Sequence, residues 1–255
     1  MNQPNTEYEN IEYRTNFLKE VIARIDFVSP VSKLEKELPP TVSKAALSSF
    51  PISEPRKAIA QELQVSPKEL HTKTTESMEW RFHGKEKEKT LTVTPHSLFV
   101  KYKSYSTFEV LRDEFLKITA EFFNAFPDVQ CSRLGLRYIN NITPPNGNIF
   151  EWGDYINESM LSIFQFYPEA THLSRVFNIL EFNFEEFQLR YQFGMPNPDY
   201  PARIRKKVFV LDLDAYYQGL QNENEVSANL QNFHGKIQEL FEHSITDNLR
   251  EIMNA

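Results

Sequence analysis

Cysteine, glycine and long apolar runs are scarce in this 255-residue chain, and each shortage excludes a class of structure. The single cysteine, Cys131, rules out an internal disulfide and a cysteine-based zinc site. With only seven glycines, the sequence contains no glycine-rich phosphate-binding motif and no GxSxG nucleophile motif. The longest apolar runs, such as Val208–Leu211, fall far short of the roughly 20 residues that span a membrane. The polar segment Met1–Asn16 also lacks the apolar region of a signal peptide, so we expect a soluble, cytoplasmic protein.

The charge of the chain is moderately acidic, which bears on the partners that it can bind. The chain has 28 Lys and Arg residues against 35 Asp and Glu residues, a formal net charge of −7. Nucleic acids are therefore disfavoured as partners unless basic residues gather locally. The best candidate for such a basic patch comprises Arg203, Arg205, Lys206 and Lys207. Its alternative interpretation is a solvated strand start that keeps a sheet edge from associating.

Alternation of apolar and polar residues predicts strands in both halves of the chain. In the first half the expected strands are Glu20–Phe27, Ala58–Val65, Thr72–His83, Lys89–Val93 and Leu98–Lys103. In the second half they are Cys131–Asn140, His172–Phe182, Phe187–Phe193 and Lys207–Tyr216. Strands of this kind pack one face and expose the other to water, which is typical of an antiparallel sheet.

Apolar residues three and four positions apart predict a long helix at the end of each half. The first follows Ser106 or Thr107, ends at Pro127, and carries the stripe Phe108, Leu111, Phe115, Ile118, Phe122 and Phe126. The second covers Glu225–Met253. Shorter helices are expected at 32–38, 42–49 and Trp152–Tyr167.

The similar order of elements in the two halves predicts an α+β fold made of a duplicated β-α-βββ(β)-α unit. Each unit would pack an antiparallel sheet around its long helix. We expect an N-terminal extension at 1–17, a first β-α-β4-α half at 18–130 and a second β-α-β3-α half at 131–255. The two halves should pack together because the loop at 143–151 is short. Their sheets could join edge to edge into one saddle or form separate lobes.

The sharpest polar pattern is the pair Asp212 and Asp214, which share one face of a predicted strand. At about 3.3 Å per residue their side chains lie roughly 6–7 Å apart, a spacing at which two carboxylates can hold a cation or act as acid and base. The structural alternative is that they face solvent or pair with Arg133 and Arg137, which share a face of another strand. We favour this alternative, because ion-pair networks perturb carboxylates as readily as active sites do.

His234 is the histidine of most interest, because it lies beside Phe233 on the apolar stripe of the last helix. It could be a buried histidine bonded to a strand carbonyl or to Asp212, or it could be a general base. One histidine without a nucleophile specifies no reaction, and the six histidines form no HxxH or HExxH motif. We therefore assign no catalytic residue, metal or cofactor. The candidate polar cluster is Arg133, Arg137, Asp212, Asp214 and His234.

Several segments, taken in order, resemble a sporadically distributed bacterial protein family of similar length and unknown function. They are Glu20-Val21-Ile22 followed by Ile25 and Phe27, the run RLGLRYIN at 133–140, and LDLD at 211–214 followed by Phe233-His234 and Ile237. The resemblance spans nearly the whole chain and implies a bacterial accessory system. The family brings no established activity, cofactor or catalytic residue, so it transfers no role to this chain.

Two functions follow from these observations. The first is a non-enzymatic binding or interaction module, in which the curved sheet and helix hold a protein partner or a small ligand. A homodimer is the default assembly by symmetry statistics. The alternative is an enzyme acting on nucleic acid or nucleotides, in which Asp212, Asp214 and His234 converge in a cleft and residues 203–207 line its mouth.

Overall fold

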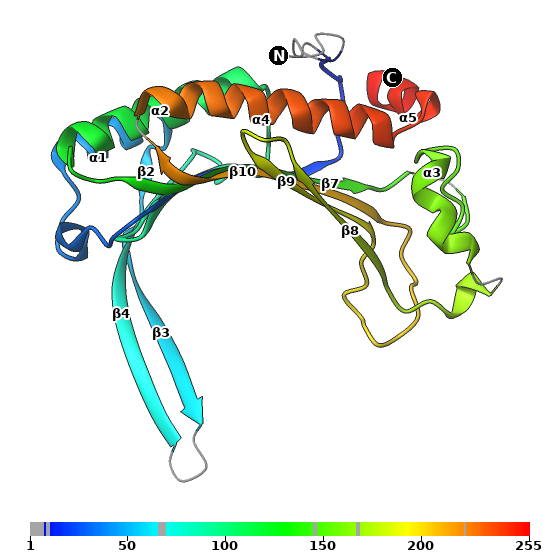
Figure 1. Cartoon of the computed structure of the whole chain (residues 1–255), viewed down its shortest axis with the longest axis horizontal. Coiled ribbons are helices and arrows are strands. Elements are labelled where there is room, and N and C mark those ends of the chain that lie inside the picture. Colours follow the sequence, from blue (N-terminus) through cyan, green and yellow to red (C-terminus); the bar gives the residue numbers. More distant parts are fainter. Residues whose placement is uncertain (1–7, 9–10, 66–69, 145–146, 167–168, 222) are drawn as a thin grey trace.

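The computed structural model shows an arch, in which one curved sheet carries the long helices along its outer side (Figure 1). The structure describes residues 8, 11–65, 70–144, 147–166, 169–221 and 223–255. Within this part of the chain, no helix is both long and apolar enough for a bilayer crossing.

All strands belong to one antiparallel sheet of ten strands. They are β1 (Leu18–Phe27), β2 (Ile52–Ser53), β3 (Arg56–Val65), β4 (Leu70–His83), β5 (Lys89–Val93), β6 (Ser97–Tyr102), β7 (Cys131–Ile142), β8 (Val176–Asn183), β9 (Gln188–Met195) and β10 (Phe209–Gln221). The order across the sheet is β2-β4-β5-β6-β1-β7-β10-β9-β8, and β3 pairs with β4. The predicted α+β fold with an antiparallel sheet is confirmed.

The strand order runs outward in the same way on both sides of the central pair β1 and β7. On one side lie β6, β5 and β4, and on the other lie β10, β9 and β8. The sheets predicted for the two halves are therefore joined edge to edge into one sheet, the first of the two alternatives. That the halves are copies of one unit, with a boundary at 130/131, stays a prediction.

The helices differ from expectation mainly in the second half. They are α1 (Pro40–Ser49), α2 (Phe108–Ala125), α3 (Glu158–Leu161), α4 (Glu223–Ser244) and α5 (Asp247–Asn254), with short 3-10 helices at 32–35, 162–165 and 170–172. The helix predicted at Trp152–Tyr167 is right only in part: regular helix begins at Glu158, a 3-10 helix follows at 162–165, and Tyr167 lies outside the described residues. The predicted unbroken last helix is wrong: Ile245 leaves it to bridge Ile156, and Thr246 caps a separate α5.

The core lies between the sheet and the helices. Along β1 the side chains of Val21, Ala23, Ile25 and Phe27 are buried, and β7 and β10 alternate in the same way. The stripe predicted for α2 is buried against them, with Phe122 stacked on Phe27 at a centroid distance of 4.8 Å. Burial of each such side chain stabilises the fold by roughly 1.5–3 kcal/mol. The alternate residues point away from the helices, on the side that we call the open face.

A two-stranded arm leaves the sheet on one side of the arch (Figure 1). Strand β4 joins the sheet only through Trp80–His83, which pairs with β5. Its outer part pairs with β3, from Arg56 opposite Glu79 to Val65 opposite Leu70. The arm is thus a β-hairpin that extends beyond the body of the protein.

Candidate functional site

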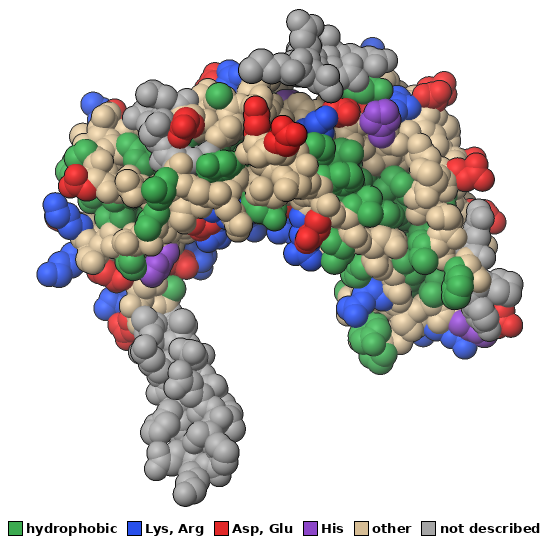
Figure 2. Space-filling model, in the orientation of Figure 1, with side chains coloured by type: hydrophobic (Ala, Val, Ile, Leu, Met, Phe, Trp, Pro, Cys, Tyr) green, Lys and Arg blue, Asp and Glu red, His purple; other side chains and the backbone are tan. Residues whose placement is uncertain are grey.

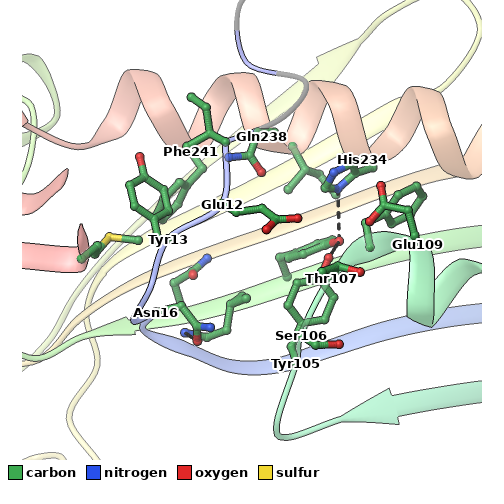
Figure 3. A pocket seen from close by; sticks show the side chains of 17 residues that line it. Glu12, Tyr13, Asn16, Tyr105, Ser106, Thr107, Glu109, His234, Gln238 and Phe241 are labelled. Carbon is green, nitrogen blue, oxygen red and sulfur yellow. Dashed lines mark hydrogen bonds between the residues drawn. The ribbon is translucent and has the colours of Figure 1, made fainter. Parts of the chain in front are cut away.

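A cavity of about 150 Å³ lies between α4 and the sheet, on the helix side of β7 (Figure 3). Its walls come from the N-terminal segment 11–18, the turn 105–109 that opens α2, strand β7 and helix α4, with Met253 of α5 at one end. A dry cavity of this volume holds a molecule about as large as benzene. The cavity therefore suits a small molecule and not a polymer.

A chain of hydrogen bonds crosses one wall of the cavity. The hydroxyls of Tyr105 and Tyr138 lie 2.9 Å apart, and the Tyr138 hydroxyl lies 3.2 Å from Nδ1 of His234 (Figure 3). When the proton of the neutral imidazole is on Nε2, Nδ1 of His234 accepts a hydrogen bond from the Tyr138 hydroxyl. The Tyr138 oxygen in turn accepts a hydrogen bond from the Tyr105 hydroxyl. Phe108 stacks flat on the imidazole at a centroid distance of 4.1 Å, which fixes the ring in this orientation.

Burial keeps the members of this chain uncharged. Desolvation lowers the pKa of His234 to about 4; the charge of Glu109 opposes this shift, and the charge of Arg112 adds to it to a smaller extent. Desolvation also raises the pKa of Tyr105 and of Tyr138 well above the ordinary value of a phenol. At neutral pH the wall therefore offers neutral hydrogen-bonding groups to a ligand.

Two carboxylates contribute negative charge to the cavity. Glu12 and Glu109 line it, and neither has a hydrogen bond or an ion pair with any part of the chain that the structure describes. Figure 3 shows the Glu12 side chain extending across the cavity. Arg112, whose charge helps to lower the pKa of His234, does not line the cavity and donates its hydrogen bonds to Asp113 and Gln231. Among the described residues, the lining contains the two carboxylates, both exposed, and no Lys or Arg side chain.

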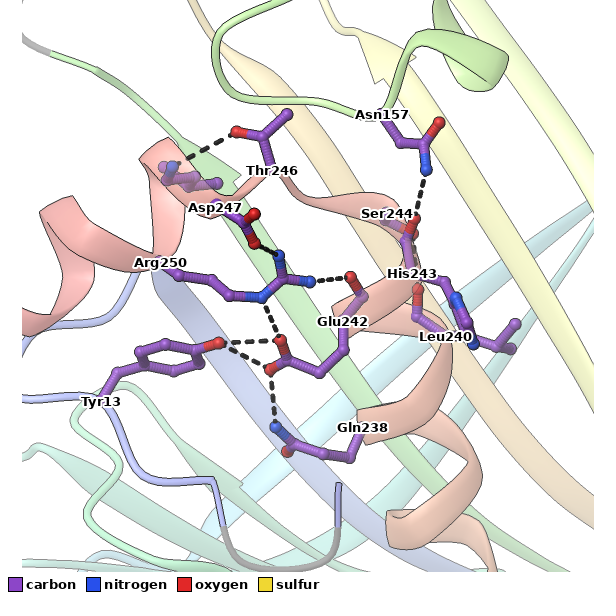
Figure 4. A network of polar contacts seen from close by, with 11 residues as sticks. Tyr13, Asn157, Gln238, Leu240, Glu242, His243, Ser244, Thr246, Asp247 and Arg250 are labelled. Carbon is purple, nitrogen blue, oxygen red and sulfur yellow. Dashed lines mark hydrogen bonds and ion pairs between the residues drawn. The ribbon is translucent and has the colours of Figure 1, made fainter. Parts of the chain in front are cut away.

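The N-terminal wall is held in place by a buried carboxylate, Glu242 of α4 (Figure 4). The Tyr13 hydroxyl donates to this carboxylate at 2.8 Å, Arg250 of α5 pairs with it at 2.9 Å, and the Gln238 amide donates to it at 3.1 Å. The Glu242 side chain is 0% exposed, so its charge depends on these partners. This contact fastens segment 11–18 and α5 to the same turn of α4.

The open face carries the two aspartates and two arginines of the predicted cluster, paired with one another. Arg137 donates two hydrogen bonds to Asp212, at 2.7 and 2.5 Å, and Arg133 binds Asp214 at 3.1 Å. Gly135 makes room for the second pair, because a Cβ there would lie 2.6 Å from Nη1 of Arg133. Burial raises the pKa of Asp214 despite its arginine neighbours, whereas the hydrogen bond to Asp212 raises the pKa of Arg137.

Other charges on the open face are paired in the same manner. The pairs are Arg24–Asp26, Arg81–Glu79, Lys101–Glu20 and Arg190–Glu181. Lys and Arg side chains are visible along the underside of the arch in Figure 2. Because each of these cations has a carboxylate partner within the sheet, the face has little charge left for a polyanion or a metal.

The predicted cluster is therefore divided between the two faces of the sheet. Arg137 and Tyr138 are successive residues of β7, so their side chains point to opposite faces. The aspartates lie on the open face, and His234 bonds Tyr138 on the helix side. The three residues of the enzyme alternative do not converge in one cleft.

The predicted basic patch is also divided. Arg203, Arg205 and Lys206 are exposed in the connection between β9 and β10, and Ile204 between them is buried. Lys207 instead lies over the rings of Trp152 and Tyr155, at 5.3 and 4.9 Å from their centroids. No residue of this run lines the cavity.

Neither a metal centre nor a reactive cysteine emerges from the described ranges. They hold no group of three or more His, Cys, Asp and Glu side chains that could bind a metal ion. Cys131 is buried, and burial raises the pKa of its thiol to about 11, so it is not a nucleophile. In comparisons with known proteins, no family model matches the chain and no curated protein is detectably similar. The family resemblance inferred from the motifs stays a prediction.

The sequence pointed to one residue of the cavity, His234, but not to its two acidic residues, Glu12 and Glu109. His234 was a candidate because it interrupts an apolar stripe. Glu12 gives no local signal, since it is one polar residue in a polar segment. Glu109 is in the first turn of α2, where an acidic residue is ordinary because of the helix dipole.

Replacement of Glu242 should destabilise the protein strongly. Glu242→Ala leaves Arg250 and the Tyr13 hydroxyl without their shared acceptor, so we expect a loss of about 3–5 kcal/mol in the free energy of unfolding. Urea denaturation measures it. The control is Glu239→Ala, which breaks a half-exposed pair with Lys236 and should cost less than about 1 kcal/mol. Equal losses in the two variants would contradict the role given to Glu242.

The low pKa of His234 should make stability depend on pH. Below pH 6.5 the unfolded chain binds a proton at this side chain, whereas the folded chain does so only near pH 4. Stability should therefore fall as the pH drops from 6.5 towards 4, by up to about 2 kcal/mol between pH 7 and pH 5. Urea titrations of wild type and His234→Gln across this range test it. Between pH 7 and pH 5 the free energy of unfolding of His234→Gln should fall by about 2 kcal/mol less than that of the wild type. If stability fell equally with pH in both proteins, His234 would not be buried as a neutral group.

Divalent cations should not stabilise the fold. Because Asp212 and Asp214 are already occupied by guanidinium groups, millimolar Mg²⁺ or Mn²⁺ should leave the melting temperature equal to that in NaCl of the same ionic strength. Binding to the native state would instead raise it by mass action. If Mg²⁺ or Mn²⁺ raised the melting temperature of the wild type but not of Asp212→Asn, the metal-dependent alternative would be supported.

Proposed function

We propose that this protein is a non-enzymatic binding module whose ligand is a small organic cation, held in the cavity beside His234. The observation that carries the proposal is a pair of exposed carboxylates, Glu12 and Glu109, that line an aromatic cavity and have no ion pair within the described residues. A bound amine or guanidinium group would place a positive charge beside them.

The remaining lining supports a cation over an anion or a neutral ligand. The aromatic residues Tyr105, Phe108, Tyr138 and Phe241 line the cavity, and aromatic rings can attract cations in addition to binding apolar groups. The neutral imidazole and phenols supply hydrogen bonds without adding positive charge. An anion would meet two carboxylates, and its burial beside them would be costly.

Binding without catalysis is favoured by the hydrogen bonds of His234. Its Nδ1 bonds the phenol of Tyr138, whose pKa burial raises, so this pair does not form a base and an activated nucleophile. The partner-holding version of the module and its setting in a bacterial accessory system stay predictions. The enzyme alternative has less support, because within the described residues Asp212 and Asp214 lie on the opposite face of the sheet from His234.

The charge of the ligand can be tested with three molecules of one shape: benzylamine, benzyl alcohol and benzoate. We expect benzylamine to raise the melting temperature in proportion to the logarithm of its concentration, and benzoate to have no effect. Putrescine tests whether a purely aliphatic diamine suffices. Isothermal titration then gives the dissociation constants.

The carboxylates are tested by a double variant, Glu12→Gln with Glu109→Gln, which should weaken benzylamine at least tenfold. The matched control is Glu35→Gln with Glu37→Gln, which removes the same charge from an exposed segment that does not line the cavity. Equal binding of benzyl alcohol and benzylamine, or equal losses in both double variants, would reject a cation site. No binding of either amine would reject the proposal.

A further inference from the structure

Strand β8 forms an open edge of the sheet. It pairs with β9 on one side, and no strand in the described ranges pairs with its other side. At the opposite end of the sheet the edge of β4 is covered by the chain itself, through β2 at residues 82–83 and β3 at residues 70–79. The two ends of the sheet are therefore unequal: at the β4 end the edge is shared by the short strand β2 and by β3 of the arm, whereas at the other end it is the single strand β8.

The outer side of β8 presents unpaired backbone groups in a regular pattern. The Phe184 amide donates to Phe187 across the β8–β9 turn, so the even-numbered residues of β8 are the ones that bond β9. The odd-numbered residues Phe177, Ile179 and Glu181 consequently point their N–H and C=O groups outward. An extended strand can pair with these groups.

The side chains of β8 suit a covered edge and not a solvated one. Phe177 is 40% exposed, Ile179 is 49% exposed and Leu180 is 46% exposed, which places apolar surface on both faces of the strand. Figure 2 shows hydrophobic side chains gathered over this end of the sheet. Lysine, proline and bulges, which keep free edges from associating, do not occur within β8, and its one charged residue is Glu181.

The edge is complementary to itself. Under a twofold axis normal to the sheet, an antiparallel partner places odd residues opposite odd residues, so the outward N–H and C=O groups of both copies meet. In such a pair Ile179 lies at or next to the axis. The charge of the strand is also compatible with this pairing. Glu181 is the only charged residue of β8, and Nε of Arg190 on β9 lies 4.0 Å from its carboxylate.

We propose that β8 is the dimerisation edge of this protein, and that its occupant is β8 of a second copy. The two sheets would then form one continuous sheet, with both open faces on the same side. The interface is formed by backbone hydrogen bonds and by the apolar side chains of the two strands. This inference is independent of the cation site, which none of the β8 residues lines.

The first test is the mass of the full chain in solution. Sedimentation equilibrium should give twice the chain mass of 30.0 kDa for the wild type. Ile179→Lys places like charges near the axis and should raise the dissociation constant at least tenfold. Val110→Lys is the control: it replaces a residue of similar exposure on α2 and should leave the dimer intact.

A second variant keeps the test decisive if Ile179→Lys folds poorly. Ile179→Cys should yield covalent dimers with a short bis-maleimide, and Val110→Cys should not, while buried Cys131 is spared. A wild type that is monomeric at all concentrations would overturn the proposal. A dimer that persists in Ile179→Lys and is not crosslinked in Ile179→Cys would also overturn it. So would the finding that a strand from another protein pairs with β8. Benzylamine binding by Ile179→Lys reports separately on the cavity.

Discussion

The antiparallel pairing of β1 with β7 is the interaction on which the rest of the structure depends. It joins strands more than a hundred residues apart in the sequence, and it places the two groups of outer strands on either side of one central pair. Its register sets which side chains face the helices. A shift of one residue would exchange Arg137 and Tyr138 between the faces and destroy both polar systems.

This alternation gives one sheet two separate chemistries. On the open face, arginines and aspartates neutralise one another in a half-solvated layer, where each pair contributes little stability. On the helix side, burial keeps His234 and its tyrosines neutral. Glu242, a carboxylate buried deeply there, has three partners that belong to three segments of the chain.

Local periodicity predicted most strands and the α2 stripe, because each depends on neighbours in sequence. It also gave pairing of Asp212 and Asp214 with Arg133 and Arg137 as one of two structural interpretations, beside exposure to solvent, since strand geometry alone puts each pair of residues on one face. It failed at the start of the helix predicted at Trp152–Tyr167, where Trp152 packs against Phe209. It could not find the wall formed by segment 11–18, because that wall depends on a contact between Tyr13 and Glu242, far apart in the sequence.

The Glu242 contact has a consequence for the order of events during synthesis. Segment 11–18 leaves the ribosome before every strand of the sheet, whereas α4 and α5, which fasten it, follow the last strand, β10. The sheet can begin to assemble once β7 has emerged and β1 is available to pair. The cavity has to wait until Arg250 has been translated, so a nascent chain can form the central strand pair well before the cavity is complete.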